Sequence, residues 1–341
     1  MKRLSPSWAL LVTVLVAGCG GQKSGDWQTN VPLAGGSPGE VLRLDDYPLY
    51  YTHISSDYGF DAYRRQGMGA AATTSLADGR RSRVPWGCTC FATARAAGGP
   101  LFGRNFDFQH QASLLLYTSP PNAFASLSMV DLYHVGFGTN ASLSDLRARP
   151  DTLGRAPYYP MDGVNEKGVA IGLMAVPSAW PPFDPAKVTL YDLALIRLVL
   201  DYATDTDHAV ELLRGYNYRA GTLPVHFLIA DRGGTSVLVE YVGQDLKAIR
   251  ATEPYMVATN FTVFGSQAPF ATGCARYDLA YSTLRERNGV LSHAEALELL
   301  SGVAQNTTMW SAVYDLEARS VDLVPGRRYP SIYRFSIGGA P

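Results

Sequence analysis

The chain reads GCTCFATARAAGGPLFGRNFDF over residues 87–108, and this stretch predicts two short strands joined by a turn. Residues 88–95 and 101–108 are rich in Thr, Phe and Leu, which are common in strands. The residues between them form a Gly/Pro cluster, which is typical of a tight turn. We therefore expect a β-hairpin.

The register of this hairpin decides which side chains meet. A turn centred on residues 97–98 places Asp107 opposite Cys88, about 5 Å away between Cα atoms. A thiol then faces a carboxylate. Arg104 and Asp107 are three residues apart and would point to opposite faces of a regular strand. We therefore expect a bulge near Gly103 that brings both side chains to Cys88.

The same residues carry a resemblance to a known family. The motif consists of Cys88-Thr89 and the stretch GRNFD over residues 103–107, in which Arg104 follows Cys88 by sixteen residues. It resembles the N-terminal nucleophile (Ntn) hydrolases of the choloylglycine hydrolase, penicillin V acylase and acid ceramidase type. In that family the cysteine becomes the first residue of the mature catalytic chain after self-cleavage, and its own α-amine serves as the base. The resemblance implies that the bond between Gly87 and Cys88 is cut.

These residue types suit the chemistry that the resemblance implies. A free thiol is mostly protonated at neutral pH, and a nearby Arg104 lowers the pKa of Cys88 by favouring the thiolate. An α-amine has a reference pKa of about 7.7 to 8.0, so it can take and return a proton near neutral pH. Asp107 would hold that amine in place.

Cys90 is the alternative nucleophile in the hairpin. A C-x-C pair also suggests a metal or redox site, but metal sites usually need four ligands at recognisable spacings. Only Cys274 and six scattered His residues remain to supply them. We assign Cys88 as the nucleophile, because only Cys88 has the sixteen-residue offset to Arg104, and Cys90 as a small packed side chain. A disulfide between Cys90 and Cys274 stays open.

A second hairpin is predicted over residues 159–177. Its text DGVNEKGVAI over residues 162–171 is a local match to the same family, with Gly168 where the turn needs a positive φ. In the family this hairpin leads to a residue of the oxyanion hole. Here the corresponding position is Ala175 rather than the Asn or Tyr of the bile-salt and penicillin enzymes. At this position only main-chain N–H groups could donate to the oxyanion. The sequence therefore supports neither bile-salt nor penicillin specificity.

Two further residues complete the predicted site. A strand predicted over residues 255–260 ends in Ala-Thr-Asn, which resembles the T-N motif of the family. The Asn260 amide would donate to the oxyanion, an interaction worth about 3 to 4 kcal/mol in other acyl-transfer enzymes. The family has an Arg that closes the catalytic network, and Arg276 is its candidate. The alternatives are a turn residue for Asn260 and a surface salt bridge for Arg276.

The rest of the chain predicts an α+β fold. Helices are expected over residues 188–202, 206–215, 273–287 and 292–304, the last with Ser292 and Glu295 as a capping box. Strands are expected over residues 225–230, 236–242, 246–250, 309–314, 320–324 and 332–337, whereas residues 109–160 are expected to form loops and short strands. This order lacks the regular alternation of a doubly wound fold. Two antiparallel sheets between helix layers fit better, and the resemblance implies that αββα sandwich.

The N-terminus predicts export. Lys2 and Arg3 precede an apolar run over residues 8–17 that is too short to span a bilayer in the usual way, as in a signal peptide. Residues 16–19 read VAGC and resemble a bacterial lipobox, in which Cys19 receives the lipid; the alternative is an ordinary signal peptide cut near residue 17. Because residue 20 is Gly rather than Asp, an outer membrane or outer-face location in the cell envelope is favoured.

These features divide the chain of 341 residues into four parts. We expect a lipoprotein signal peptide over 1–19, a flexible tether over 20–39, a pro-segment over 40–87 and an Ntn-hydrolase domain over 88–341. The pro-segment has too many large apolar residues for a linker. A formal net charge of −1 without a basic block gives no support for nucleic-acid binding.

The expected function is hydrolysis of a linear amide bond in a small N-acyl substrate by a membrane-anchored lipoprotein. The resemblance implies no metal or organic cofactor. Aromatic residues that could surround an acyl chain, or could equally be core, are Tyr158, Tyr159, Trp180 and Phe183. The alternatives are an acyltransferase of the penicillin-biosynthesis type and a non-catalytic lipoprotein on the same scaffold. A papain-like protease is disfavoured, because the C-G-S-C-W neighbourhood is missing.

Overall fold

The structure is a computed structural model that describes residues 39–68, 87–96, 98–109, 112–176, 183–221, 223–243, 245–269 and 272–338. The predicted signal peptide with Cys19, the tether apart from Gly39, residues 69–86 of the pro-segment and Trp180 lie outside the described residues.

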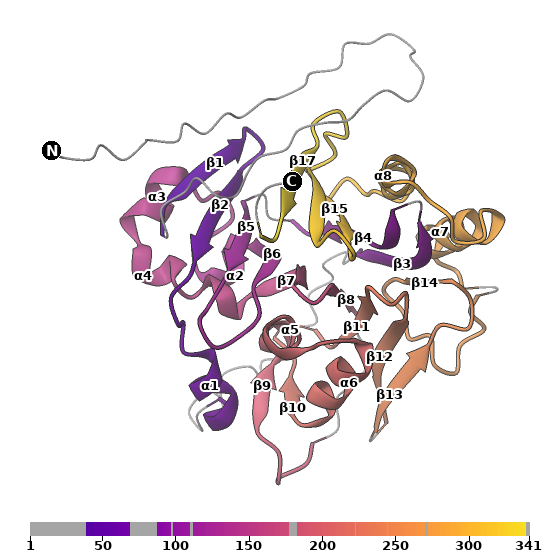
Figure 1. Cartoon of the computed structure of the whole chain (residues 1–341), viewed down its shortest axis with the longest axis horizontal. Helices are drawn as coiled ribbons and strands as arrows, with labels where there is room; N and C mark the ends of the chain where they lie inside the picture. The colour runs from indigo at the N-terminus through magenta and orange to yellow at the C-terminus, as the bar shows by residue number, and fades with distance from the viewer. Residues whose placement is uncertain are drawn as a thin grey trace, which may run out of the picture.

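A nine-stranded sheet is the larger of the two main sheets (Figure 1). Its strands in spatial order are β1 (Val41–Asp45), β2 (Leu49–Ile54), β5 (Ser113–Thr118), β6 (Ser126–Asp131), β7 (Pro160–Asn165), β8 (Val169–Ala175), β11 (Val225–Asp231), β12 (Ser236–Val242) and β13 (Asp245–Arg250). Neighbouring strands are antiparallel except β2 and β5, which are parallel. The central strands β7 and β8 are buried at every residue, because both faces of the sheet are covered.

A six-stranded antiparallel sheet packs on the inner face of the larger one. Its strands in spatial order are β14 (Tyr255–Ala258), β3 (Thr89–Ala96), β4 (Gly99–Asp107), β15 (Thr308–Asp315), β16 (Ser320–Pro325) and β17 (Tyr333–Ser336). Two short parallel strands, β9 (Thr189–Tyr191) and β10 (Asn217–Arg219), form a separate pair. The hairpin that opens the predicted catalytic domain therefore lies near the centre of the smaller sheet.

Helices cover the outer faces of both sheets. The helices α5 (Asp192–Tyr202) and α6 (Thr206–Arg214) pack on the larger sheet, and α7 (Ala275–Glu286) and α8 (His293–Gly302) pack on the smaller one (Figure 1). The expected αββα sandwich is thus confirmed. The remaining helices are short: α1 (Phe60–Gln66), α2 (Leu132–Val135), α3 (Leu143–Ala148), α4 (Pro150–Leu153) and the 3₁₀ turn η3 (Ala156–Tyr158). The chain as described contains no helix with the length and apolarity that membrane crossing requires.

Three sequence predictions differ from the structure. Residues 109–160 contain the six-residue strands β5 and β6, as the expected loops and short strands allow, but they also contain four short helical segments that were not expected, α2, α3, α4 and η3. The helix predicted from residue 188 begins only at Asp192, because residues 189–191 pair with β10. The strand predicted to end at Asn260 ends at Ala258. The capping box of Ser292 and Glu295 is confirmed.

The described part of the predicted pro-segment contributes two strands to the larger sheet. Its strand β2 lies parallel to β5 from Leu49 to Ile54, and β1 forms the edge of the sheet. Leu49 and Phe60 are fully buried in the central core. Burying a Leu or Phe side chain contributes about 1.5 to 3 kcal/mol, so this segment has a strong reason to stay with the rest of the fold.

The turn between β7 and β8 packs closely against the main chain that follows β15. Gly168 has φ +75°, and a Cβ there would overlap the main-chain oxygen of Leu316, just after β15. Gly138 has a similar φ of +82° and nothing near it. We expect Gly168→Ala to lower the free energy of unfolding by at least about 1 kcal/mol more than Gly138→Ala, because both suffer the positive φ but only one suffers the overlap. Urea denaturation measures this difference. Equal losses would show that the turn yields to an extra methyl group.

Candidate active site

The predicted hairpin is present, but its register differs by one residue from the expected one. The turn pair Ala96↔Gly99 is centred on residues 97–98 as predicted. An irregularity between Thr93 and Ala96 then shifts the ladder, so that Cys90 pairs with Arg104. The expectation that Asp107 pairs with Cys88 is therefore wrong, because a bulge beside the turn changes every pair beyond it.

The bulge expected near Gly103 is also wrong. Gly103 pairs regularly with Phe91 on one side and with Val313 on the other. Its missing side chain instead makes room for the Phe91 ring, which a Cβ would overlap. The second irregularity of β4 lies at its end, where β15 has an extra residue opposite Phe106 and Asp107. Both Arg104 and Asp107 nevertheless lie close enough to Cys88 to act on its thiol.

Cys88 is held by its main chain. Its N–H donates to Oδ1 of Asn260 at 2.7 Å, and its carbonyl oxygen accepts from Nη1 of Arg276 at 2.5 Å. The same Nη1 donates to Oγ1 of Thr89 at 3.0 Å, and Nη2 of Arg276 donates to Oδ1 of Asn260 at 3.1 Å. The structure thus brings Asn260 and Arg276 together at Cys88, although they are 172 and 188 residues away along the chain.

The Cys88 sulfur is buried between charges of both signs. Burial raises the pKa of the Cys88 thiol above its ordinary value, and the charge of Arg104 and the main-chain N–H of Asp107 act in the opposite direction. Arg104 does favour the thiolate as expected, but burial outweighs it, so the resting group is a thiol. Attack on a carbonyl therefore requires a base that removes the proton during the reaction.

Arg104 does not pair with Asp107. Its Nε donates to Oδ2 of Asp162 at 3.2 Å, and its Nη1 donates to the carbonyl oxygen of Leu173 at 2.5 Å and to Sγ of Cys90 at 3.5 Å. Arg104 and Asp162 are both completely buried. Within the described residues its Nη2 has no hydrogen-bond partner, so one arm of the guanidinium remains available to a negative sulfur.

Asp107 is anchored by groups that the sequence analysis missed. Thr308 donates to Oδ1 of Asp107, and Nε2 of Gln305 donates to Oδ2 at 2.7 Å. Burial raises the pKa of the Asp107 carboxyl, and these two hydrogen bonds oppose the increase. In this state the N–H of Cys88 goes to Asn260 rather than to Asp107. The expected contact between Asp107 and the nitrogen of Cys88 is therefore not formed in this structure.

Cys90 has the surroundings of a packed side chain. It lies in the core between the sheets, and burial raises the pKa of its thiol to about 12 despite the nearby Arg104. Cys88, Cys90 and Cys274 are all free thiols, so the disulfide that the sequence left open is not formed. No three His, Cys, Asp or Glu side chains of the described residues gather at a spacing that could hold a metal ion.

A buried ion pair fixes the loop that carries Asn260. Nε2 of His226 lies 2.7 Å from the carbonyl oxygen of Thr259, and its Nδ1 lies 3.0 Å from Oε1 of Glu240. The imidazole thus lies between a main-chain carbonyl and a carboxylate, within hydrogen-bond distance of both. Glu240 also accepts from the main-chain N–H groups of Val263 and Phe264. The pair thus holds the loop on both sides of Asn260, just beyond β14.

Burial alone would raise the pKa of Glu240, but the hydrogen bond from His226 and the two main-chain donors lower it below its ordinary value. Glu240 therefore stays ionised in the interior. No local motif marks His226 or Glu240 as partners, because the contact is made across neighbouring strands β11 and β12. Asp162 was not expected at the site either, although it is the first residue of the DGVNEKGVAI text of the second hairpin.

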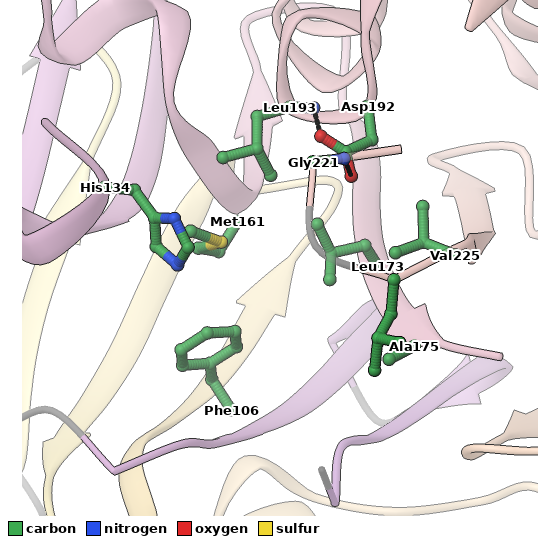
Figure 2. Close-up of a pocket in the computed structure, with 10 residues that line it drawn as sticks. Phe106, His134, Met161, Leu173, Ala175, Asp192, Leu193, Gly221 and Val225 are labelled. Atoms are coloured by element: carbon green, nitrogen blue, oxygen red, sulfur yellow. Dashed lines mark hydrogen bonds between the residues drawn. The ribbon is translucent and has the colours of Figure 1, made fainter. Parts of the chain in front are cut away.

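A pocket lies beside the residues that surround Cys88 (Figure 2). Its empty volume, counted together with the open solvent at its mouth, is about 450 Å³. It is lined by Phe106, His134, Met161, Leu173, Ala175, Asp192, Leu193, Gly221, Leu223 and Val225. Figure 2 shows His134 and Met161 facing Leu173, Ala175 and Val225 across the cavity. The lining is mainly apolar, and Asp192 is its one carboxyl group; burial raises the pKa of that group to about 6.

Ala175 lines the pocket and also contacts Asn260. Its carbonyl oxygen accepts from Nδ2 of Asn260 at 3.0 Å, which leaves one hydrogen of that amide for another acceptor. The three described aromatic residues suggested from the sequence do not line this pocket. Tyr158 packs on Phe60 and Tyr63, Tyr159 lies beside Arg155, and Phe183 is 71% exposed. For Tyr158 the alternative of a packing role is the correct one.

Comparison with known proteins identifies a family whose profile matches this chain. The profile described as "Linear amide C-N hydrolases, choloylglycine hydrolase family" matches residues 88–288. Among solved structures, a variant of the conjugated bile acid hydrolase from Clostridium perfringens is similar, with a TM-score of 0.55 and 17% identity over 73% of this chain and 92% of that one. The penicillin V acylase from Agrobacterium tumefaciens gives a TM-score of 0.52 and 16% identity over 73% and 86%. These structures share the fold. No protein with a curated description matches this sequence.

The ion pair at the Asn260 loop gives a prediction on stability. Glu240→Ala leaves His226 and the N–H groups of Val263 and Phe264 without their buried acceptor, so we expect it to lower the free energy of unfolding by about 3 to 5 kcal/mol. Glu298 is exposed on α8, and Glu298→Ala should change it by less than about 0.5 kcal/mol. Chemical denaturation of both variants is the measurement. A similarly small change in both would mean that solvent readily replaces the carboxylate.

Proposed function

Because the chain belongs to the choloylglycine hydrolase family of linear amide C-N hydrolases, we propose that it cleaves a small N-acyl amide with Cys88 as its nucleophile. The family makes the protein a hydrolase of linear amide bonds. The observation that carries the assignment to Cys88 is the convergence of Asn260 and Arg276 on its main chain, with Arg104 and Asp107 acting on its sulfur.

The proposed reaction uses four residues. The α-amine of Cys88, exposed by cleavage after Gly87, takes the thiol proton as the sulfur attacks the substrate carbonyl. The remaining amide hydrogen of Asn260 stabilises the oxyanion. The α-amine then protonates the leaving amine, and water releases the acyl group from the sulfur. Arg104 favours the thiolate, and Arg276 keeps Asn260 and the Cys88 main chain in register.

The pocket supports an apolar acyl group as the electrophilic half of the substrate. It begins at Ala175, whose carbonyl group touches the proposed oxyanion donor, and its walls include Phe106, Met161 and Leu173. The similar solved enzymes act on conjugated bile acid and penicillin V by their names. Ala175 offers no side-chain hydrogen-bonding group of the kind that Asn or Tyr would supply, so neither substrate is carried over to this chain.

The proposal places the enzyme in the cell envelope, exported and lipid-anchored through Cys19. Support comes from the sequence: the basic start, the apolar run over residues 8–17 and the VAGC text. Self-cleavage would separate this anchor covalently from the catalytic chain. The strand pairing of β2 with β5 supplies a non-covalent connection between the two parts.

The assignment of the nucleophile is tested by two matched substitutions. Cys88→Ala should lower kcat for N-acyl amides by at least about 10³-fold, because the covalent route is lost. Cys90→Ala removes a buried thiol two residues away and should keep most of the activity. An electrophilic acyl-amide probe followed by intact-mass measurement should label wild-type and Cys90→Ala protein only. Activity in Cys88→Ala together with inactive Cys90→Ala protein would reverse the assignment.

Maturation gives a second prediction. Active protein should consist of two fragments that separate on denaturing electrophoresis, and N-terminal sequencing of the larger one should begin at Cys88. The fragments should co-purify under native conditions, because β1 and β2 remain paired within the larger sheet and Leu49 and Phe60 remain buried. Cys88→Ala protein, as the control, should stay a single chain. A single uncut wild-type chain with full activity would mean that the α-amine is not the base.

A further inference from the structure

The peptide unit between Gly87 and Cys88 is hydrogen-bonded at both of its polar atoms. On the nitrogen side, Cys88 N–H donates to Oδ1 of Asn260 at 2.7 Å. On the carbonyl side, the Gly87 oxygen accepts from Nε2 of Gln305 at 2.8 Å. Gly87 and Cys88 are both buried. The bond that self-cleavage would break is therefore presented with a donor at its carbonyl and an acceptor at its nitrogen.

Gln305 is held firmly in this position. It lies in the connection between α8 and β15, where its N–H donates to Oγ1 of Thr308 and its carbonyl oxygen accepts from the N–H of Thr308. The second hydrogen of its Nε2 goes to Oδ2 of Asp107 at 2.7 Å. Because Asp107 and Gly87 accept from the same amide nitrogen, the carboxylate orients the amide toward the Gly87 carbonyl.

Gly87 and Gln305 depend on each other sterically. A Cβ at position 87 would overlap Nε2 of Gln305. Any larger residue would therefore displace the amide from the carbonyl that it contacts. Glycine at this position permits the close approach of a donor, in addition to giving the main chain more conformational freedom.

We propose that Gln305 is a catalytic residue of self-cleavage, whose side-chain amide stabilises the oxyanion that forms on the Gly87 carbonyl. The inference rests on the self-cleavage contained in the proposed function. Gln305 lies beyond residue 288, where the match to the family profile ends. Its Nε2 already donates to the Gly87 carbonyl oxygen at 2.8 Å, so a donor stands beside the atom that gains negative charge when the sulfur attacks.

The reaction is balanced with water as its only co-reactant. The Cys88 sulfur bonds to the Gly87 carbonyl carbon, and the C–N bond to Cys88 breaks. The thiol proton ends on the departing nitrogen, which becomes the α-amine. Water then hydrolyses the thioester, giving a carboxylate on Gly87 and restoring the thiol of Cys88. Gln305 acts in the first stage, where the carbonyl oxygen becomes an oxyanion.

The test is a pulse–chase measurement of self-cleavage in the full-length chain. Gln305→Met keeps a side chain of similar length without the donor, and Gln305→Glu replaces the donor by a carboxylate. Both should slow cleavage by about 10²- to 10³-fold, as expected for the loss of one oxyanion donor. The matched control is Asn306→Ala at the next residue, which is exposed and contacts Arg327. It should cleave at the wild-type rate.

Hydroxylamine, which attacks thioesters, separates the two stages. If Gln305 acts in the first stage, hydroxylamine will not restore the rate of either variant. Wild-type cleavage by soluble, cooperatively unfolding Gln305→Met or Gln305→Glu protein would overturn the proposal, as would restoration by hydroxylamine, because the thioester would then form normally. An uncut wild-type chain would instead refute self-cleavage itself, which distinguishes the two failures.

Discussion

The ion pair between Arg104 and Asp162 joins the two sheets at the centre of the molecule. Arg104 comes from β4 of the smaller sheet and Asp162 from β7 of the larger one, and both side chains are completely buried. Trp310 and Tyr314 of β15 also donate to Asp162, so each of its two oxygens accepts at least one hydrogen bond. Removing one partner of such a pair leaves an uncompensated buried charge, which costs about 3 to 5 kcal/mol. The spacing of the sheets at the site depends on this contact.

The same ion pair determines the electrostatics of the proposed nucleophile. Asp162 neutralises much of the Arg104 charge, but the guanidinium still favours ionisation of both thiols in the hairpin. At Cys88 burial has the larger effect and raises the pKa of the thiol, so a base is needed to remove its proton. The mechanism proposed here supplies that base from the chain itself, as an α-amine. Cleavage of a buried peptide bond would thus create the group that the buried thiol lacks.

Residues 41–54 and the described residues after 288 both belong to the fold that surrounds Cys88. β1 and β2 extend the larger sheet, while β15, Gln305 and Thr308 complete the surroundings of Asp107. A catalytic chain reduced to the region matched by the family profile would lack these contacts. Under the proposed self-cleavage, these contacts would hold the bond between Gly87 and Cys88 in a defined geometry before any substrate binds.

The sequence by itself predicted the two hairpins, because strand-forming runs and turn glycines are local properties. Its resemblance to a known family supplied the αββα class and the candidate residues Cys88, Arg104, Asp107, Asn260 and Arg276. The tertiary structure decided the rest. One extra residue beside the turn shifted the register of β3 and β4, and the expected short strands of residues 109–160 took the places of β5 and β6 in the interior of the larger sheet. Asp162, Glu240, His226 and Gln305 acquire their partners only through contacts between distant segments. Such pairings are set by how sheets and loops pack, and no spacing along the chain encodes them.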